Sequence, residues 1–158
     1  AGHLSFRDQG GSWPPHCIQD TEGAAFSAAL DLPADAVVVT KGVRFDQDQH
    51  SAFDQTGFAQ RLTNDGIRRL VVGGLAEDVC VLATVLDARR SGFEVLLLEE
   101  GTKPVTVEGG RKALTDMIKA GAKFVDAELD VCVTAPGAEH QRPGDPEDAC
   151  DDGRSGKI

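Results

Sequence analysis

The sequence lacks any apolar run long enough to cross a membrane, and no signal peptide opens it, so neither a membrane-spanning nor an exported protein is indicated. It also lacks a surplus of positive charge, because 16 lysines and arginines stand against 26 aspartates and glutamates. A chain with a formal net charge of −10 is not expected to bind nucleic acid or an anionic membrane. The four cysteines show no CxxC pairing, so neither a zinc knuckle nor a disulfide framework is indicated, and a reducing cytoplasm fits best.

Length and composition predict one folded domain followed by a tail. The chain of 158 residues is long enough for a real hydrophobic core, and it contains no internal repeat. Residues 127–158 hold eight acidic and three basic residues and hardly any apolar run. Such a segment buries too little surface to offset its ordering entropy. We therefore expect a domain over residues 1–126 and an acidic, disordered tail over residues 127–158, with an interaction role for the tail as an alternative.

Apolar runs and helical patterns alternate along the domain, as they do in parallel α/β sheets. The runs are almost continuously apolar, which is typical of parallel strands covered on both faces. Strands are expected at residues 36–40, 68–75, 93–101 and 122–125. Helices are expected between them, ending at Gly66, at Gly92 and at about Ala120.

A cysteine stands where the second of these strands gives way to a helix. Asp78 is a natural N-cap, which puts Cys80 in the first turn, where the helix dipole and backbone N–H groups favour a thiolate. Lys41 directly follows the first strand. Ligands of open parallel sheets bind at the carboxyl ends of strands, so we expect the lysine and the cysteine to share a site. A core cysteine and a solvated loop lysine are the alternative interpretation.

Two histidines lie in the irregular segment rich in glycine and proline that opens the chain. His3 and His16 flank Trp13 in this segment, which could close over a pocket. Each histidine taken alone is more often a surface residue than a functional one.

Three segments resemble nicotinamidases of the isochorismatase-like cysteine hydrolase superfamily. GSWPPHCIQDTEGAAF (residues 11–26) resembles the family segment WPxHC(V/I)QxTxGAxF, and KGVRFDQDQHSAF (residues 41–53) resembles its lysine loop. VVGGLAEDVCVLATVLDARRSGFEV (residues 71–95) resembles its nucleophile strand and helix. The match runs in order from about His3 to Val125. It implies an α/β three-layer sandwich, in which helices flank a parallel sheet, and hydrolysis of nicotinamide to nicotinic acid and ammonia in NAD salvage.

The resemblance also implies the catalytic roles. Cys80 would be the nucleophile that forms a thioester with the carbonyl carbon of the amide. The backbone N–H groups of Ala76 and Cys80 would form the oxyanion hole beside a cis peptide between Leu75 and Ala76. Lys41 would orient the catalytic groups and stabilise charge near the thiolate.

Substrate and metal contacts follow from the same resemblance. Trp13 would stack on the substrate ring, and His50 would line the ring pocket. His16 matches a metal ligand, and His3 matches a position that is a ligand in some members. The implied cofactor is a divalent ion, zinc, iron or manganese, which would hold the pyridine nitrogen and nearby waters. Relatives often form homo-oligomers, although no interface is evident in these residues.

Several positions depart from the family pattern. His50 stands where tyrosine is usual, Val79 where tyrosine, histidine or phenylalanine is usual, and Asp20 where glycine is common. The family also begins with a strand ending in the catalytic aspartate, followed by a DxH pair of metal ligands. Counting back from His3, both would precede Ala1, so the first strand is expected to be missing from this sequence. No aspartate present here has a good claim to the role of the base.

Three functions remain open at this point. The first is a nicotinamidase whose N-terminal segment is not included in the sequence. The second is a catalytically inert remnant that acts as a binding module. The third is a related hydrolase of another amide or of an isochorismate-like vinyl ether, because the altered positions 50 and 79 could reshape the ring pocket.

Overall fold

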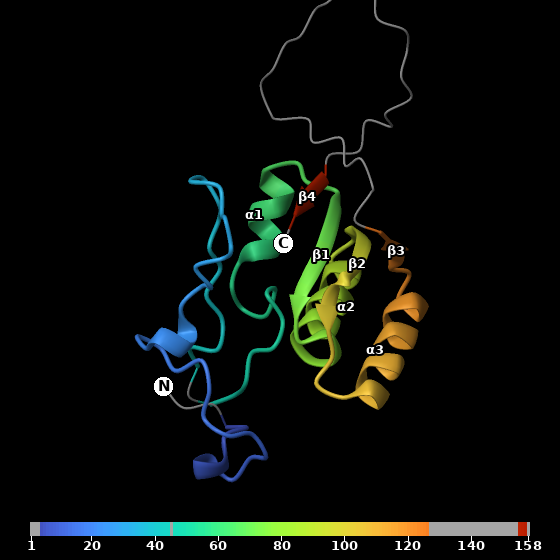
Figure 1. The fold of residues 1–158 in the computed structure, drawn as a ribbon. Coiled ribbons are helices and arrows are strands. Elements are labelled where there is room, and N and C mark those ends of the chain that lie inside the picture. The colour runs from blue at the N-terminus through green and yellow to red at the C-terminus, as the bar shows by residue number, and fades with distance from the viewer. Residues whose placement is uncertain (1–3, 45, 127–154, 158) are drawn as a thin grey trace, which may run out of the picture.

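A computed structural model describes residues 4–44, 46–126 and 155–157 (Figure 1). The described helices begin with two short 3-10 turns, Arg7–Gln9 and Glu22–Ala24, in an irregular N-terminal segment. That segment runs along one side of the sheet and its helices in Figure 1. None of the described helices has the length and apolar character that a membrane span requires.

The sheet is parallel, and its strand order is β3-β2-β1-β4. Strand β1 (Arg69–Leu75) and strand β2 (Glu94–Lys103) form its centre, with Leu70 opposite Val95 and Val72 opposite Leu97. Strand β3 (Lys123–Val125) pairs with β2, and strand β4 (Ser155–Lys157) pairs with β1. The predicted α/β class with a parallel sheet is confirmed.

Each helix lies close to where the sequence predicts it. Helix α1 spans Phe58–Asn64, helix α2 spans Leu82–Arg90 and helix α3 spans Val107–Lys119. A π-helical turn, η3 (Glu77–Val81), leads directly into α2. The Thr106 hydroxyl caps α3 by accepting from the Gly109 N–H, which satisfies one of the donors at the helix start.

One hydrophobic cluster joins the sheet to the helices. From β1 and β2 it takes Leu70, Val72, Val95 and Leu97, and from the helices Phe58, Leu62, Val85, Ala88, Ala113 and Met117. The intervening strand residues Val71 and Leu96 are also buried, on the opposite face of the sheet, because side chains alternate along a strand. The continuous apolar runs are therefore explained by burial on both faces.

The expected strand at residues 36–40 is not formed. Among the described residues, the backbone hydrogen bond made by this stretch closes a local turn, in which the Ala36 N–H donates to the Pro33 carbonyl. Val39 packs against the core, but Val37 and Val38 are 50% and 61% exposed. The valines favour an extended backbone, but the neighbour of β1 on this side is β4, so no strand is available to pair with them.

The expected tail is described only at its end. Residues 127–154 and 158 lie outside the described residues. Residues 155–157, expected to be without structure, form β4 and pair with Arg69–Val71. They supply hydrogen-bond partners to an edge of β1 that is otherwise open.

The core makes a direct prediction for stability. Met117 is fully buried on α3, and its neighbour Ile118 is 54% exposed. Met117→Ala should therefore lower the free energy of unfolding by about 2–5 kcal/mol in urea denaturation. Ile118→Ala, the control on the same helix, should lower it by about 0.5 kcal/mol or less. Equal losses in the two variants would show that α3 does not pack as described.

An ion pair between neighbouring strands makes the stability depend on pH. The Arg69 guanidinium donates to Glu94 at 2.9 Å, and Lys123 lies 3.1 Å from the other oxygen. The hydrogen bond from Arg69 is the main cause that lowers the pKa of Glu94 from its ordinary value of 4.5, and the contact with Lys123 lowers it further. A lowered pKa stabilises the fold above the ordinary value, and this contribution is lost as pH falls through the lowered value.

Glu94→Gln should therefore lower the free energy of unfolding at neutral pH, by about 0.5–1 kcal/mol because the pair is partly solvated. The difference between this variant and the parent should vanish in acid, below the lowered pKa. Urea denaturation at the two pH values measures it, with the exposed Glu22→Gln as control. A difference that persists unchanged in acid would mean that the carboxylate charge is not its source.

Candidate functional site

Cys80 lies where β1 gives way to the helix, as predicted. The strand ends at Leu75, the peptide bond between Leu75 and Ala76 is cis, and Cys80 follows in η3, half-buried. The Ala76 carbonyl accepts hydrogen bonds from the Val79 N–H at 3.1 Å and the Val81 N–H at 3.0 Å. The predicted cis peptide and the predicted place of Cys80 in the first turn are both present.

The backbone before this junction is shaped by glycines. The pairing of β1 with β2 shifts register between Val72 and Gly74, and Gly74 has a φ of 120°, which side chains rarely allow. A Cβ on Gly73 would lie 3.3 Å from the Gly101 carbonyl oxygen, so the two strands approach closely here. The glycines let the chain change direction directly ahead of the cysteine.

Lys41 meets Cys80 in space, although 39 residues separate them in sequence. The Lys41 ammonium donates to the Cys80 Sγ at 3.2 Å and to the Gln49 carbonyl oxygen at 3.5 Å. Within the described residues no carboxylate contacts this ammonium. A cation beside the sulfur can stabilise negative charge that develops there during a nucleophilic reaction, so the expected pairing of these residues carries chemical meaning.

Carboxylates hold the start of the cysteine's helix against β2 and α3. Glu77 is buried and accepts from the Thr102 hydroxyl at 2.7 Å. Asp78 accepts from the backbone N–H groups of Val105 at 2.8 Å and Thr106 at 3.3 Å. The predicted role of Asp78 as N-cap of its own helix is wrong, because its carboxylate binds a loop 27 residues away and Ala76 is the capping residue.

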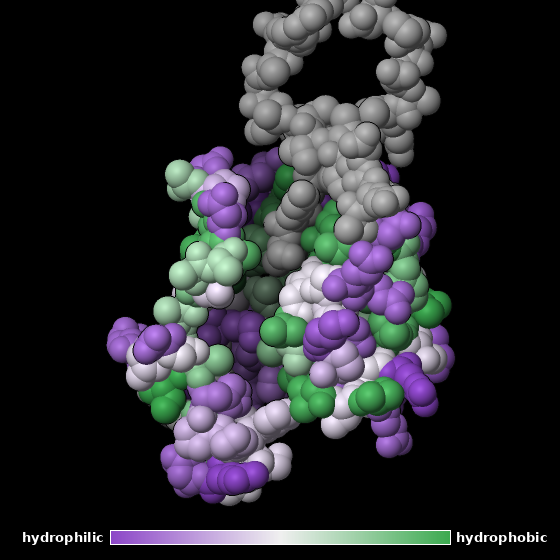
Figure 2. All heavy atoms as spheres, viewed as in Figure 1, coloured by the Kyte–Doolittle hydropathy of each residue, from purple (hydrophilic) through white to green (hydrophobic). Residues whose placement is uncertain are grey.

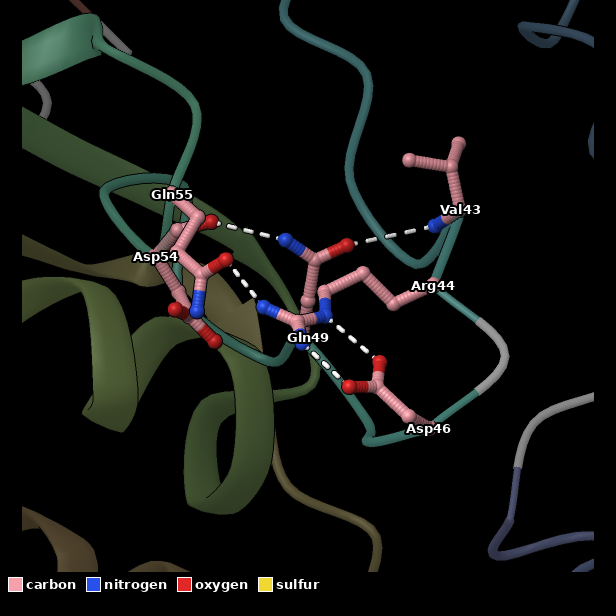
Figure 3. Close-up of polar contacts among 6 residues, drawn as sticks. All are labelled: Val43, Arg44, Asp46, Gln49, Asp54 and Gln55. Carbon is pink, nitrogen blue, oxygen red and sulfur yellow. Dashed lines mark hydrogen bonds and ion pairs between the residues drawn. The ribbon is translucent and has the colours of Figure 1, made fainter.

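The loop after Lys41 carries an exposed polar cluster (Figure 3). Arg44 contacts both oxygens of Asp46 and the side chain of Gln55. The hydrogen bond from Arg44 lowers the pKa of Asp46. Because these groups are solvated, the cluster shapes the loop and adds little stability.

The aromatic and histidine cluster of the N-terminal segment is formed separately. The rings of Trp13 and His16 lie 6.1 Å apart, and Phe6 lies 5.1 Å from His16. In the described part of the chain this cluster does not contact Cys80. His3 lies outside the described residues, and His50 is exposed at the surface.

His16 is oriented as a metal ligand requires. Its Nδ1 lies 2.8 Å from the Pro14 carbonyl, which can only accept, so Nδ1 carries the proton and a neutral ring would present Nε2 to a metal. Yet no group of three histidine, cysteine or acidic side chains that could hold an ion occurs within the residues that the structure describes. His16 thus fits the role of one ligand, and the described residues do not supply a full set.

Two cavities lie in the described part of the chain, and Cys80 lines neither of them. One of about 240 Å³ is lined by Val37–Thr40, Thr56–Phe58 and Arg61, directly ahead of Lys41. The other, of about 800 Å³, is lined by Glu77, Glu99–Glu100, Thr102–Pro104 and Phe124–Asp126. Figure 2 shows hydrophilic residues on the floor of a furrow between the N-terminal segment and the sheet.

Gln49 and Thr84 escaped the sequence analysis. Gln49 is 4% exposed, and its backbone carbonyl accepts from Lys41. Thr84 is 6% exposed, and its hydroxyl accepts from the Ala52 N–H. A glutamine in a polar, irregular loop has no periodic signal. Thr84, four residues after Cys80 on the same helix, could have been suspected only from that spacing.

Comparison with known proteins identifies close similarity along most of the chain. A family model described as the Isochorismatase domain matches residues 2–129. The chain is 37% identical to the nicotinamidase of Escherichia coli over 118 residues, 70% of this chain and 55% of that protein. It is 34% identical to the nicotinamidase/pyrazinamidase of Mycobacterium tuberculosis, across 75% of this chain and 65% of that one. The chain therefore spans a little over half to about two thirds of these relatives.

Solved structures give the same result. The pyrazinamidase of Pyrococcus horikoshii in complex with zinc matches with a TM-score of 0.74 and 43% identity, covering 78% of this chain and 68% of that one. The PnC1 protein of L. infantum in complex with nicotinate matches with a TM-score of 0.75 and 40% identity, covering 78% and 65%.

The Lys41 contact predicts the reactivity of Cys80. Lys41→Met keeps much of the side-chain length but removes the charge, so iodoacetamide should alkylate Cys80 on the order of tenfold more slowly at neutral pH. Peptide mass spectrometry measures the rate for each cysteine separately. The exposed Cys17 is the internal reference, and its rate should not change. An unchanged Cys80 rate would refute the electrostatic role of Lys41.

Proposed function

The chain belongs to the isochorismatase domain family, and on that premise we propose that it hydrolyses nicotinamide to nicotinic acid and ammonia through a thioester on Cys80. The observation that carries the proposal is the 3.2 Å contact between the Lys41 ammonium and the Cys80 thiol at the carboxyl end of β1. The similarity to nicotinamidases from bacteria and yeasts supports nicotinamide as the substrate. Nicotinic acid formed in this way would serve NAD salvage.

The first half of the reaction forms the thioester. The Cys80 sulfur attacks the amide carbonyl carbon, a carbon–sulfur bond forms, and the carbon–nitrogen bond breaks. Ammonia leaves with the proton that the thiol gave up. Lys41 would support this step by stabilising the negative charge on the sulfur as the thiol proton leaves.

The second half releases the acid. Water attacks the thioester carbon, the carbon–sulfur bond breaks, and the proton lost by the water returns to the sulfur. A base must move a proton in both halves. Since no carboxylate of the described residues contacts Lys41, we assign the base to a carboxylate outside them.

Charge on the carbonyl oxygen needs hydrogen-bond donors. The backbone N–H groups of Ala76 and Cys80 would take this role, because Ala76 is the N-cap residue of η3 and Cys80 lies within that turn. Glu77 and Asp78, between these donors, are held by Thr102 and the loop before α3. The donors are thereby fixed by neighbours rather than by the substrate.

The substrate ring is assigned to the N-terminal segment. Trp13 would stack on the ring, and His50 would border it. A divalent ion, held by His16 together with His3, would bind the pyridine nitrogen and polarise nearby water. Zinc is the ion named for the Pyrococcus horikoshii structure, and iron or manganese suits the same type of ligand.

The remaining assignments follow from this function. The partner is a small-molecule amide rather than nucleic acid or a membrane, the location is cytoplasmic, and assembly as a homo-oligomer is included in the proposal. Residues 1–126 form the hydrolase domain, and residues 127–158 form the acidic tail.

Loss of Cys80 should abolish the reaction. Protein expressed from its complete reading frame should release ammonia from nicotinamide, and Cys80→Ala should reduce the rate at least about a thousandfold. Cys17→Ala, which removes the other described cysteine, should keep most of the activity. Ammonia release by Cys80→Ala at the parental rate would overturn the assigned nucleophile.

The substrate is tested in the same assay. Pyrazinamide and an isochorismate-like vinyl ether, offered beside nicotinamide, separate the proposed reaction from the alternatives. Turnover of the vinyl ether alone would replace the amidase by a related hydrolase. A folded protein that turns over none of them would favour the binding module.

A further inference from the structure

We propose that Gln49 is a positioning residue that holds the Lys41 ammonium against the Cys80 thiol. The proposal rests on the proposed function and deepens it, because it says what keeps the Lys41 ammonium in contact with the Cys80 sulfur. It rests on a set of hydrogen bonds that converge on one buried amide within an otherwise irregular loop (Figure 3).

Both the oxygen and the nitrogen of the Gln49 side-chain amide form hydrogen bonds. Its Oε1 accepts from the Val43 N–H at 3.3 Å, and its Nε2 donates to the Asp54 carbonyl at 2.8 Å. The residue is 4% exposed, although polar side chains are seldom buried so completely. Gln49 therefore joins the chain just after Lys41 to the chain eight to thirteen residues further on.

Gln49 also contacts the lysine directly. Its backbone carbonyl accepts from the Lys41 ammonium at 3.5 Å, and that ammonium lies 3.2 Å from the Cys80 sulfur. A lysine side chain loses rotamer entropy when it is held in one place. A carbonyl fixed by the two bonds of its own side chain offers the ammonium a rigid second partner.

The loop itself has few other means of keeping its shape. The described residues between Lys41 and Gln49 belong to no helix or strand, so ladder hydrogen bonds do not fix them. The amide of Gln49 takes the place of such bonds. Removing it would leave the backbone from Lys41 to Val43 without this restraint, so the ammonium could move away from the sulfur.

A second hydrogen bond joins this loop to the helix of the nucleophile. The Ala52 N–H donates to the Thr84 hydroxyl at 3.0 Å, and Thr84 lies on α2 one turn after Cys80. Thr84 is buried, as is Ser51, which directly precedes the donor Ala52. Gln49 thus ties Lys41 to a segment that is itself anchored to α2, the helix that directly follows the turn carrying Cys80.

The test separates positioning from general stability. Gln49→Leu has a similar size and cannot form the hydrogen bonds, and Gln60→Leu removes an exposed amide that donates to Asn64. Two readouts are taken on the folded chain at neutral pH. One is the alkylation rate of Cys80 by iodoacetamide relative to Cys17, and the other is the ultraviolet absorbance of the Cys80 thiolate, as a difference against Cys80→Ser.

We expect Gln49→Leu to slow Cys80 alkylation by about three- to tenfold and to lower the thiolate absorbance, and Gln60→Leu to change neither. The decisive comparison repeats Gln49→Leu in a Lys41→Met background. If Gln49 acts through the lysine, its replacement has no further effect there. An equal loss in both backgrounds, or no loss in the first, overturns the proposal.

Two further variants keep the test decisive. Gln49→Met, unbranched like glutamine, replaces Gln49→Leu if leucine prevents folding. Thr84→Val removes the acceptor for the Ala52 N–H while keeping the shape, and the proposal predicts a loss of the same kind and direction. Alkylation requires no amide hydrolysis, so a positive cycle in a protein that releases no ammonia would refute the proposed function and leave the positioning role intact.

Discussion

Parallel pairing of β1 with β2 fixes the position of the carboxyl end of β1, and the candidate catalytic residues lie around that end. The chain leaves β1 at Leu75, turns through a cis peptide and enters the helical turn that carries Cys80. The site is completed from the other side by a loop that brings Lys41 to 3.2 Å from the sulfur. The contact between Lys41 and Cys80 therefore joins an irregular loop to the carboxyl end of a strand within the sheet, and the loop needs hydrogen bonds of its own to hold its shape.

The side chains that anchor the site are polar and mostly buried. Glu77 and Asp78 fix the helix start to β2 and to the loop before α3. Gln49 holds the lysine loop together from within, and Thr84 fixes that loop to α2. No described buried side-chain polar atom lacks a partner. A satisfied network of this kind rigidifies a site, because leaving any one group unpaired in a low dielectric is costly.

The sequence predicted the elements whose signal is local. Helix α3 and strand β2 follow directly from periodicity and apolar runs. The meeting of Lys41 with Cys80 was predicted correctly, although the strand expected before Lys41 is not formed. The predicted strand at residues 36–40 failed because its valines report backbone preference, whereas a strand also needs a neighbour. Asp78 was assigned to its own helix because capping patterns are local, and the partner it binds is 27 residues away. Gln49 left no trace in the sequence, since its role exists only once the loop has folded around it.

The central claim is that the Cys80 sulfur carries the acyl group during hydrolysis. The most direct measurement is rapid acid quenching of the reaction with nicotinamide, followed by peptide mass spectrometry at a series of quench times. The account predicts a nicotinoyl thioester on the peptide containing Cys80, formed and lost at rates that match product release. Production of nicotinic acid while Cys80 stays unmodified at every quench time would contradict it.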